Sequence, residues 1–388
     1  MISRKVLTYM VIGAAVLLLA VSVGTVAAKD PTLTPQEQLG KSLFFDKSLS
    51  QPRGQACAAC HGPAVGWTGP DAKINAHGAV YEGAVKGVFG NRKPPSAAYG
   101  GDSPVFSGPP FVGGMFWDGR ATGATLGDPL AEQAQGPFLN PREQNNADAG
   151  VVVDKVLHSS YRHLFLQVCG SGKTVALYYD CIGLSIAAYE KSKEVSAFTS
   201  KYDLSLKGKA KLTRQERQGL ELFQSDKAKC SGCHVLSPSS APVFTDFTYD
   251  NLGVPKNPEN PFYTEPSGDP NFVDLGLGGI LGIASENGKM KVPTLRNVDK
   301  RPNDHFVKAY SHNGYFKSLE EIVHFYNTRD VLAPCESTHK PKPGVNCWPA
   351  PEVPENVNRT ELGSLGLTHG EETALVAFLK TLSDGYKP

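Results

Sequence analysis

One pentapeptide pattern occurs twice in the chain and constrains its fold more than any other feature. The two copies are Cys57-Ala58-Ala59-Cys60-His61 and Cys230-Ser231-Gly232-Cys233-His234. Cys-x-x-Cys-His is the attachment signature of c-type haem: the thiols add to the porphyrin vinyl groups, and the histidine binds the iron. The chain is therefore predicted to carry two covalent c-type haems, held by Cys57, Cys60, His61, Cys230, Cys233 and His234.

A longer repeat around the motifs argues against a redox dithiol or a zinc site. Leu33-Thr34-x-Gln36-Glu37-x-x-Gly40-x-x-Leu43-Phe44 precedes the first motif, and the same spacing recurs from Leu212 to Phe223, offset by 179 residues. In both copies Thr is followed three residues later by Glu, which is the capping-box signature of a helix N-terminus. A thioredoxin-type dithiol would need a βαβ setting, and a four-thiolate zinc site would leave both histidines without a role.

The repeat predicts a mostly α fold of two cytochrome c-like domains, each with one covalent haem and with long loops. The Gly- and Pro-rich stretch 62–116 is expected to be loop, whereas the apolar pattern from residue 174 predicts a helix. The capping box Thr368-x-x-Glu371 predicts the last helix. The expected division is a signal peptide over 1–28, a first domain over 29–200, an exposed lysine-rich linker over 201–211 and a second domain over 212–388.

Residues 1–28 have the pattern of an export signal. Arg4-Lys5 precede an apolar run, and Val26-Ala27-Ala28 fits a small-residue cleavage site. The run approaches the length that spans a bilayer, so an uncleaved membrane anchor is the alternative. In both cases the body of the protein is expected in the periplasm, where c-type haem is attached.

Four cysteines remain outside the haem motifs, and their spacing suggests disulfides. An oxidising compartment favours the nearest-neighbour pairs Cys169–Cys181 and Cys335–Cys347, although four cysteines allow three pairings. The charge is nearly balanced, with 39 basic and 38 acidic residues and no basic stripe. A nucleic-acid partner is therefore not expected.

Further motifs resemble those of the bacterial di-haem cytochrome c peroxidases and their MauG-type relatives. They occur in the family's order and, with the two haem motifs, span nearly the whole mature chain. A short insertion within 123–129 separates the first two of them compared with the commoner pattern. The motifs are Phe116-Trp117-Asp118-Gly119-Arg120-Ala121, Glu132-Gln133-Ala134-x-Gly136-Pro137-x-x-Asn140-Pro141-x-Glu143, Val292-Pro293-Thr294-Leu295-Arg296-Asn297-Val298 and His312-Asn313-Gly314.

The resemblance implies roles around the first haem. Glu143 matches the acid that moves a proton between the peroxide oxygens, and Gln133 matches the amide that holds it. Trp117 matches a tryptophan between the two haems, and His77, 16 residues after His61, matches a displaceable distal ligand. The alternatives are a solvated carboxylate for Glu143, a core aromatic for Trp117 and a surface histidine for His77.

At the second haem the chain departs from the best-known peroxidases. Where they place a methionine ligand, the family spacing leads to Tyr326, and a tyrosinate is the MauG-type choice. The alternatives are a core tyrosine, His324 as the ligand, or Met290 reaching in from its loop.

Calcium is a second point of departure. The family often holds a calcium ion between its domains with an Asn side chain, and here that position is Lys93, unless the register slips to Asn91. A charged lysine cannot ligate a hard cation, although its ammonium can occupy the ion's place. Calcium therefore stays open in the sequence.

The leading function is a periplasmic peroxidase that reduces hydrogen peroxide with electrons from a small cytochrome c or cupredoxin. The first alternative keeps the fold: a MauG-type enzyme that oxidises side chains of a partner protein through high-valent haem. The second is a non-catalytic di-haem electron carrier. The resemblance leaves a homodimer open.

Overall fold

The described chain alternates short helices with long loops, as the sequence predicted. The computed structural model describes residues 32–236, 242–266 and 268–388. The predicted signal segment over 1–28 lies outside the described residues. Within these ranges no helix is both long enough and apolar enough to cross a membrane.

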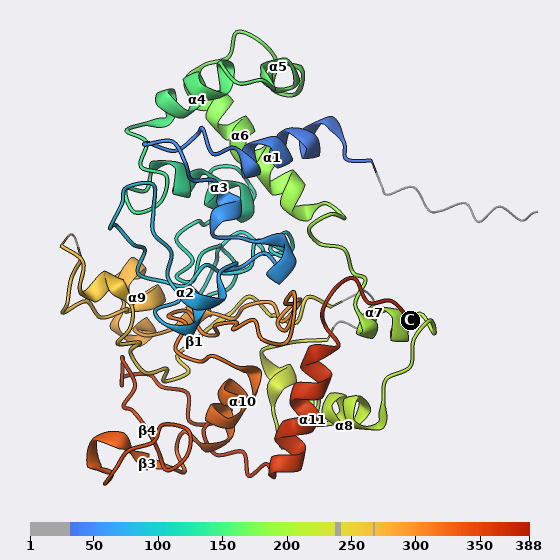
Figure 1. Ribbon diagram of the computed structural model, residues 1–388, viewed down its shortest axis with the longest axis vertical. Helices are drawn as coiled ribbons and strands as arrows, with labels where there is room; N and C mark the ends of the chain where they lie inside the picture. The colour runs from blue at the N-terminus through green and yellow to red at the C-terminus, as the bar shows by residue number, and fades with distance from the viewer. Residues whose placement is uncertain (1–31, 237–241, 267) are drawn as a thin grey trace, which may run out of the picture. The chain divides into compact units, whose positions relative to one another are not determined.

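The helices of the first half, residues 33–200, gather around one long helix. Helices α1, α3 and α4 all pack against α6, as Figure 1 shows. The segment 62–116 is largely loop, as expected, with a 3-10 turn at Pro63–Val65 and the short helix α2. The helices are α1 (Pro35–Phe45), α2 (Ala72–Ala76), α3 (Pro129–Leu139), α4 (Ala149–Leu157), α5 (Arg162–Cys169) and α6 (Val175–Lys191).

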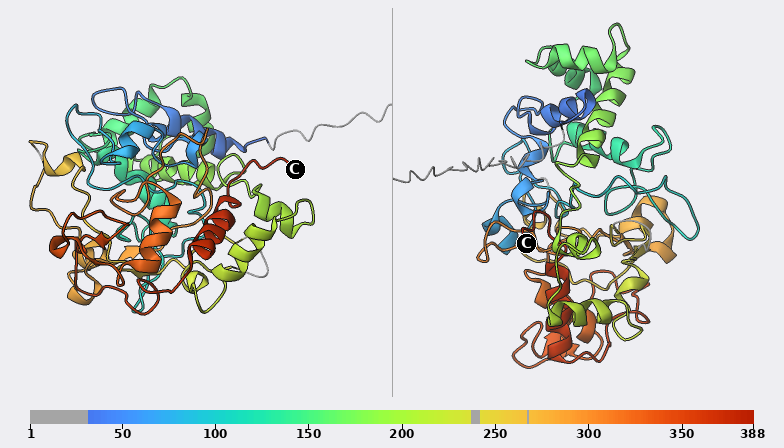
Figure 2. Two further views of the ribbon diagram at one scale, coloured as in Figure 1. Left: turned by 60° about the horizontal axis from the view of Figure 1, so that its bottom comes forward. Right: turned by 90° about the vertical axis from the view of Figure 1, so that its right-hand side faces the viewer.

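The second half, residues 201–388, repeats this plan with different helices. Helix α8 packs against α11, and the yellow-green α8 lies beside the red α11 in both views of Figure 2. Among the described residues of this half, the sheets are two pairs of two-residue strands, β1–β2 and β3–β4. The elements are α7 (Lys201–Leu206), α8 (Arg214–Phe223), α9 (Gly276–Leu281), α10 (Leu319–Thr328), α11 (His369–Lys380), β1 (Tyr249–Asp250), β2 (Met290–Lys291), β3 (Ala333–Pro334) and β4 (Cys347–Trp348).

The two copies of the sequence repeat fold in the same way. Complete capping boxes open α1 at Thr34 and α8 at Thr213, and a third opens α11 at Thr368, so all three predicted helix starts are confirmed. Each copy then crosses its partner helix at a glycine. A Cβ on Gly40 would lie 1.9 Å from a carbonyl oxygen of α6, and a Cβ on Gly219 would lie 1.9 Å from one of α11. Only a residue without a side chain allows the helices to approach so closely.

Each half has its own apolar core, and contacts between the halves join Leu33–Pro388 into one compact unit. The domain boundaries given above therefore stay a prediction. The first core is centred on α1 and α6, with Phe44, Phe138, Phe165 and Tyr189 almost fully buried; the second contains Phe223, Phe244, Phe316, Phe325 and Phe378.

The expected exposed linker over 201–211 differs from the structure in its first part. Lys201–Leu206 forms α7, and Tyr202 and Asp203 on it are buried. Asp203 forms a fully buried ion pair with Arg296, 2.7 Å away, which fixes this segment to the second core. The lysine content of residues 201–211 predicted an exposed segment. Apolar and acidic residues alternate with these lysines, however, and this allows one face of α7 to be buried.

Both disulfides have the expected nearest-neighbour pairing. Cys169 bonds Cys181, and Cys335 bonds Cys347. The four cysteines of the two haem motifs are free thiols. The predicted pairing is confirmed, and the disulfides leave the four motif cysteines unpaired, as haem attachment requires.

Candidate haem and active site

The first motif presents two thiols and one imidazole. A turn of 3-10 helix at Cys57–Ala59 carries the thiols, and Cys57 and Cys60 are both half-buried. The Nδ1 atom of His61 is 3.2 Å from the carbonyl oxygen of Trp67, so Nε2 is the nitrogen left for a metal. Burial lowers the pKa of His61 to about 4. The imidazole is therefore neutral at physiological pH, which is the form that ligates iron.

The second motif repeats this geometry. Its 3-10 turn covers Cys230–Gly232, and His234 Nδ1 is 2.8 Å from the carbonyl oxygen of Phe244. Burial lowers the pKa of His234 as well. A backbone partner on Nδ1 fixes the ring and its tautomer, which is the usual support of a metal-binding histidine. Both motifs therefore fit a haem.

A large, mostly apolar cavity opens in front of the second motif. Tyr326 on α10 and Met290 on β2 both line it, whereas His324 points at Glu372, 2.9 Å away. Burial raises the pKa of Tyr326, so its phenol stays neutral unless a cation replaces the proton. Residues that line the cavity include Lys93, Trp117, Cys230, Cys233, His234, Met290, Lys291, Lys308, His312 and Tyr326.

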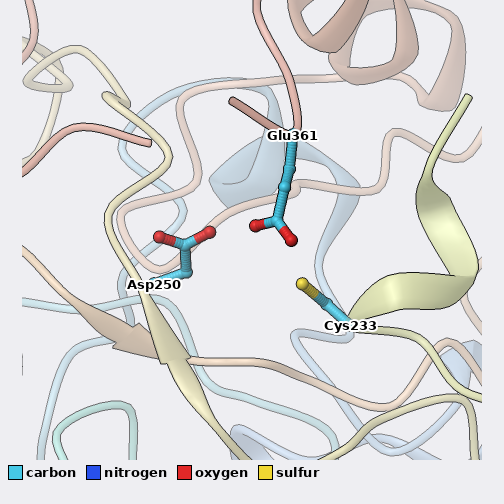
Figure 3. A group of neighbouring side chains, drawn as sticks. All are labelled: Cys233, Asp250 and Glu361. Atoms are coloured by element: carbon cyan, nitrogen blue, oxygen red, sulfur yellow. The ribbon is translucent and has the colours of Figure 1, made fainter. Parts of the chain in front are cut away.

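Two carboxylates stand beside the second thiol of this motif. Figure 3 shows the Glu361 carboxylate turned toward the Cys233 sulfur and the Asp250 carboxylate, at the end of β1, turned toward that of Glu361. The three ligand atoms lie within 4.8 Å of one another. Burial raises the pKa of Asp250, and Glu361 adds to the effect. Because haem attachment consumes the Cys233 thiol, we interpret these carboxylates as neighbours of the haem edge.

Glu143 lies beside the first motif. It follows α3 in a turn, where Asn140 Nδ2 donates a 2.7 Å hydrogen bond to Glu143 Oε1. Burial raises the pKa of Glu143. The pKa values of Cys57 and Cys60 are raised by burial, and in both cases the charge of Glu143 contributes, so this carboxyl acts on the pocket of the first motif.

The resemblance gave Gln133 the task of holding Glu143, but the structure shows a different partner. Gln133 is half-buried on α3, and the carboxyl of Glu143 accepts its hydrogen bond from Asn140, to which the resemblance assigned no role. The insertion expected within 123–129 is folded around Glu132, which accepts hydrogen bonds from the backbone N–H groups of residues 123, 125 and 126.

Trp117 lies where the first half (residues 33–200) meets the second half (residues 201–388), a boundary that we call the seam. It also lines the cavity. Its indole Nε1 donates a 3.0 Å hydrogen bond to the carbonyl oxygen of Lys93. Its ring meets that of His312 edge-on, with centroids 6.5 Å apart. His312 is buried with no partner for Nε2 among the described residues, and burial lowers its pKa to about 4.

His77 is on the surface in this structure. It ends α2, its side chain is 63% exposed, and its Nδ1 is 3.3 Å from Glu259. The structure does not bring it to the first motif, and its role as a displaceable ligand stays a prediction.

Sequence reasoning missed two amides that contact the thiols of the first motif. Gln144 Nε2 is 3.7 Å from Cys57 Sγ, and Gln55 Nε2 is 4.0 Å from Cys60 Sγ. Within the described residues, the amide oxygens of both glutamines are buried without a partner. Neither position belongs to a motif, so only the folded chain reveals them.

The chain is similar in sequence and in fold to known di-haem proteins. Residues 34–211 match the model of a family described as di-haem cytochrome c peroxidase. The methylamine utilization protein MauG of Paracoccus denitrificans (strain Pd 1222) is 35% identical over 379 residues, covering 94% of this chain and 93% of that protein. The cytochrome c551 peroxidase of Nitrosomonas europaea is 29% identical over 314 residues, 78% of each chain. The crystal structure of the diheme peroxidase BthA from Burkholderia thailandensis E264 superposes with a TM-score of 0.74 at 31% identity, covering 91% of this chain and 87% of that one.

Proposed function

Because the chain belongs to the family of di-haem cytochrome c peroxidases and MauG proteins, we propose that it is a periplasmic peroxidase. It is an oxidoreductase of the di-haem cytochrome c peroxidase type. Its proposed reaction takes hydrogen peroxide, two protons and two electrons to two waters, with a small cytochrome c or cupredoxin as the electron donor. The observation that carries the proposal is the buried carboxyl of Glu143 beside the first motif.

Glu143 is the proposed proton carrier of the reaction. The first haem, when bound, supplies the iron at which the O–O bond is reduced. Glu143 takes the proton from one peroxide oxygen and returns it to the other as the bond breaks. Asn140 occupies Oε1, which leaves Oε2 to hold this proton. A raised pKa suits the task, since a carboxyl of ordinary acidity would hold the proton too weakly at neutral pH.

Trp117 is the proposed link between the two sites. The hydrogen bond to the Lys93 carbonyl fixes the indole on the seam, and an aromatic ring there shortens the through-space gaps for electron transfer. His234 and Tyr326 are the proposed ligands of the second haem. His77 is a proposed ligand of the first haem in one redox state, and binding would require it to leave Glu259.

The test is the reaction of the holoprotein with hydrogen peroxide and a reduced cytochrome c. Glu143→Gln keeps the shape of the side chain but removes its proton exchange, so turnover is expected to fall by about 10²–10⁴-fold. Glu320→Gln is the matched control, because Glu320 pairs with Lys380 in an exposed ion pair and is expected to leave turnover unchanged. Equal turnover in both variants would contradict the role of Glu143.

A MauG-type oxidation of a partner protein is the second candidate. It is supported by the 35% identity to MauG over nearly the whole chain and by Tyr326, which faces the cavity of the second motif. Rapid turnover with reduced cytochrome c favours the peroxidase, whereas cross-linking or oxidation of a partner after peroxide addition favours the MauG-type reaction. If neither the oxidised nor the half-reduced holoprotein reacts with peroxide, the electron carrier is the correct alternative.

A further inference from the structure

Two buried lysines lie where the halves of the chain meet. Lys308 is 5% exposed, Lys93 is 9% exposed, and both line the same cavity as Trp117. In the described ranges their ammonium groups form hydrogen bonds to carbonyl and hydroxyl oxygens, and neither forms an ion pair with a carboxylate. Burying an ammonium without a counter-ion is costly, so its oxygen partners must compensate for the lost water.

The Lys308 ammonium is held by three backbone carbonyl oxygens. Its Nζ donates to Val65 at 2.9 Å, to Asn297 at 2.6 Å and to Lys300 at 3.1 Å, which uses all three of its protons. Val65 belongs to the first half, and the other two acceptors belong to the second. This ammonium therefore bonds the halves to each other.

The backbone around Lys308 is shaped for this contact. Gly66 has a φ of +77°, and a Cβ on it would lie 2.7 Å from the Asn297 Cβ and 3.2 Å from the Lys308 Nζ. Only glycine adopts this conformation without strain and also leaves the space open. The chain comes close enough at this point for the carbonyl of Val65 to reach the ammonium.

Lys93 has two roles: its side chain carries a buried positive charge, and its backbone carbonyl supports Trp117. Its Nζ donates to the Thr68 hydroxyl at 3.1 Å and to the Pro94 carbonyl at 3.0 Å. Its backbone N–H donates to the His312 carbonyl at 2.8 Å, and its own carbonyl accepts the indole N–H of Trp117. A shift of Lys93 would therefore move the indole.

A calcium ion does not fit at this position. Calcium takes 6–8 oxygen ligands, whereas the ammonium of Lys93 offers no acceptor. The carbonyl oxygens around Lys308 already accept from its ammonium. A divalent ion would also meet the positive charges of Lys93 and Lys308; of the charged groups that act on Lys308 within the described residues, Asp299 is negative, whereas Lys93, Lys300 and Arg301 are positive.

We propose that the ammonium groups of Lys93 and Lys308 take the place of a structural metal ion: the ammonium of Lys308 joins the two halves of the chain, and that of Lys93 anchors the residue whose backbone carbonyl holds Trp117 on the seam. The proposal goes beyond the peroxidase function, and it holds whichever oxidant or partner the protein uses.

The first experiment measures calcium in the wild-type holoprotein. After dialysis against a chelator, metal analysis is expected to find far less than one calcium per chain. The thermal midpoint and the electron paramagnetic resonance spectrum are expected to be the same with the chelator and with added calcium. A stoichiometric calcium that survives dialysis, or a calcium-dependent rise in the midpoint, would overturn the proposal, and neither readout requires a variant to fold.

The second experiment compares Lys93→Met and Lys308→Met with a matched control, Lys155→Met. The Lys155 ammonium is also held by oxygens, but all of them belong to the first half: Leu49, Ser50, Gln51 and Asn146 at 3.1, 2.9, 3.5 and 2.6 Å. The two seam variants are expected to lower the midpoint by about 5 °C or more and to change the spectrum of the second haem. The control is expected to leave that spectrum unchanged. If either seam variant, once folded, keeps the wild-type spectrum, the proposal is wrong.

Discussion

Burial shifts the pKa values of two residues in the pocket of the first motif in opposite directions. It lowers the pKa of His61 to about 4 and raises the pKa of Glu143. In both cases the neutral form is favoured, because a charged group loses its hydration in the interior. The same pocket therefore keeps an imidazole free to bind iron and a carboxyl able to hold a proton.

The first residue-scale prediction concerns the pH dependence of peroxide reduction. Glu143 must be ionised to accept a proton, and its pKa is raised above the ordinary 4.5. The second-order rate constant with peroxide is therefore expected to fall as pH drops through this raised pKa. Stopped-flow measurements across pH would show the decrease in the wild type and its absence in Glu143→Gln. A wild-type profile that is flat down to about pH 4.5 would contradict the assignment.

The second residue-scale prediction concerns the ligand of the second haem. Tyr326→Phe removes the phenol oxygen that faces the cavity and is expected to change the paramagnetic resonance and optical spectra of that haem. Tyr202→Phe is the control, since Tyr202 is buried in the same core but does not line the cavity. If the Tyr326→Phe spectra match the wild type, Met290 becomes the leading ligand.

The third residue-scale prediction concerns Glu190, a buried carboxyl on α6. Burial raises its pKa well above the ordinary value, and within the described residues its Oε2 has no hydrogen-bond partner. A raised folded-state pKa means that the folded protein binds more protons, so stability is lost as pH rises from about 4.5 through that pKa. Glu190→Gln removes this loss. Its free energy of unfolding is expected to exceed that of the wild type increasingly as pH rises above about 5, as measured by denaturant titration.

At the scale of elements, the sequence predicted helix starts better than helix contacts. The capping boxes at Thr34, Thr213 and Thr368 are local signals, because each satisfies backbone groups within one turn. Gly40 and Gly219 occupied equivalent positions of the repeat, but their partners are far along the chain. Nothing in the repeat itself identified α6 and α11 as the helices that these glycines touch.

The element-scale prediction is that both repeat glycines are indispensable at the helix crossings. Gly40→Ala and Gly219→Ala each place a Cβ 1.9 Å from a carbonyl oxygen, so the helices must separate. Each is expected to lower the free energy of unfolding by about 1–3 kcal/mol or more. Gly370→Ala in α11 is the control, because the nearest atom to its Cβ is 4.0 Å away and alanine favours a helix. A denaturant titration in which all three variants match the wild type would contradict the crossing.

At the scale of the whole molecule, the sequence predicted the parts but not how they join. Motif spacing identified Cys57, Cys230 and their histidines, because haem attachment requires those residues in that order. It identified Lys93 as a departure but not Lys308, which belongs to no motif and is explained only by the carbonyl oxygens around it. Contacts across the seam depend on the tertiary fold, and one sequence carries no local signal for them.

The last prediction tests the ion pairs of Arg92, one of which crosses that seam. Arg92 is largely buried and bonds Asp118 in the first half at 2.5 Å and Asp274 in the second half at 2.6 Å. Burial alone would raise the pKa of Asp274, but the charge and hydrogen bonds of Arg92 lower it. Arg92→Gln leaves the buried carboxylate of Asp274 without its cation, while Asp118 keeps its pair with Arg120, and the change is expected to cost about 3–5 kcal/mol of unfolding free energy. Because a lowered folded-state pKa gives stability that is lost as pH falls through it, the difference in unfolding free energy from the wild type should shrink in acid.

The control is Arg359→Gln, which breaks an exposed ion pair with Asp330 and is expected to cost about 0–1 kcal/mol. Equal losses in the two variants, or a difference that does not change with pH, would show that the seam does not depend on Arg92.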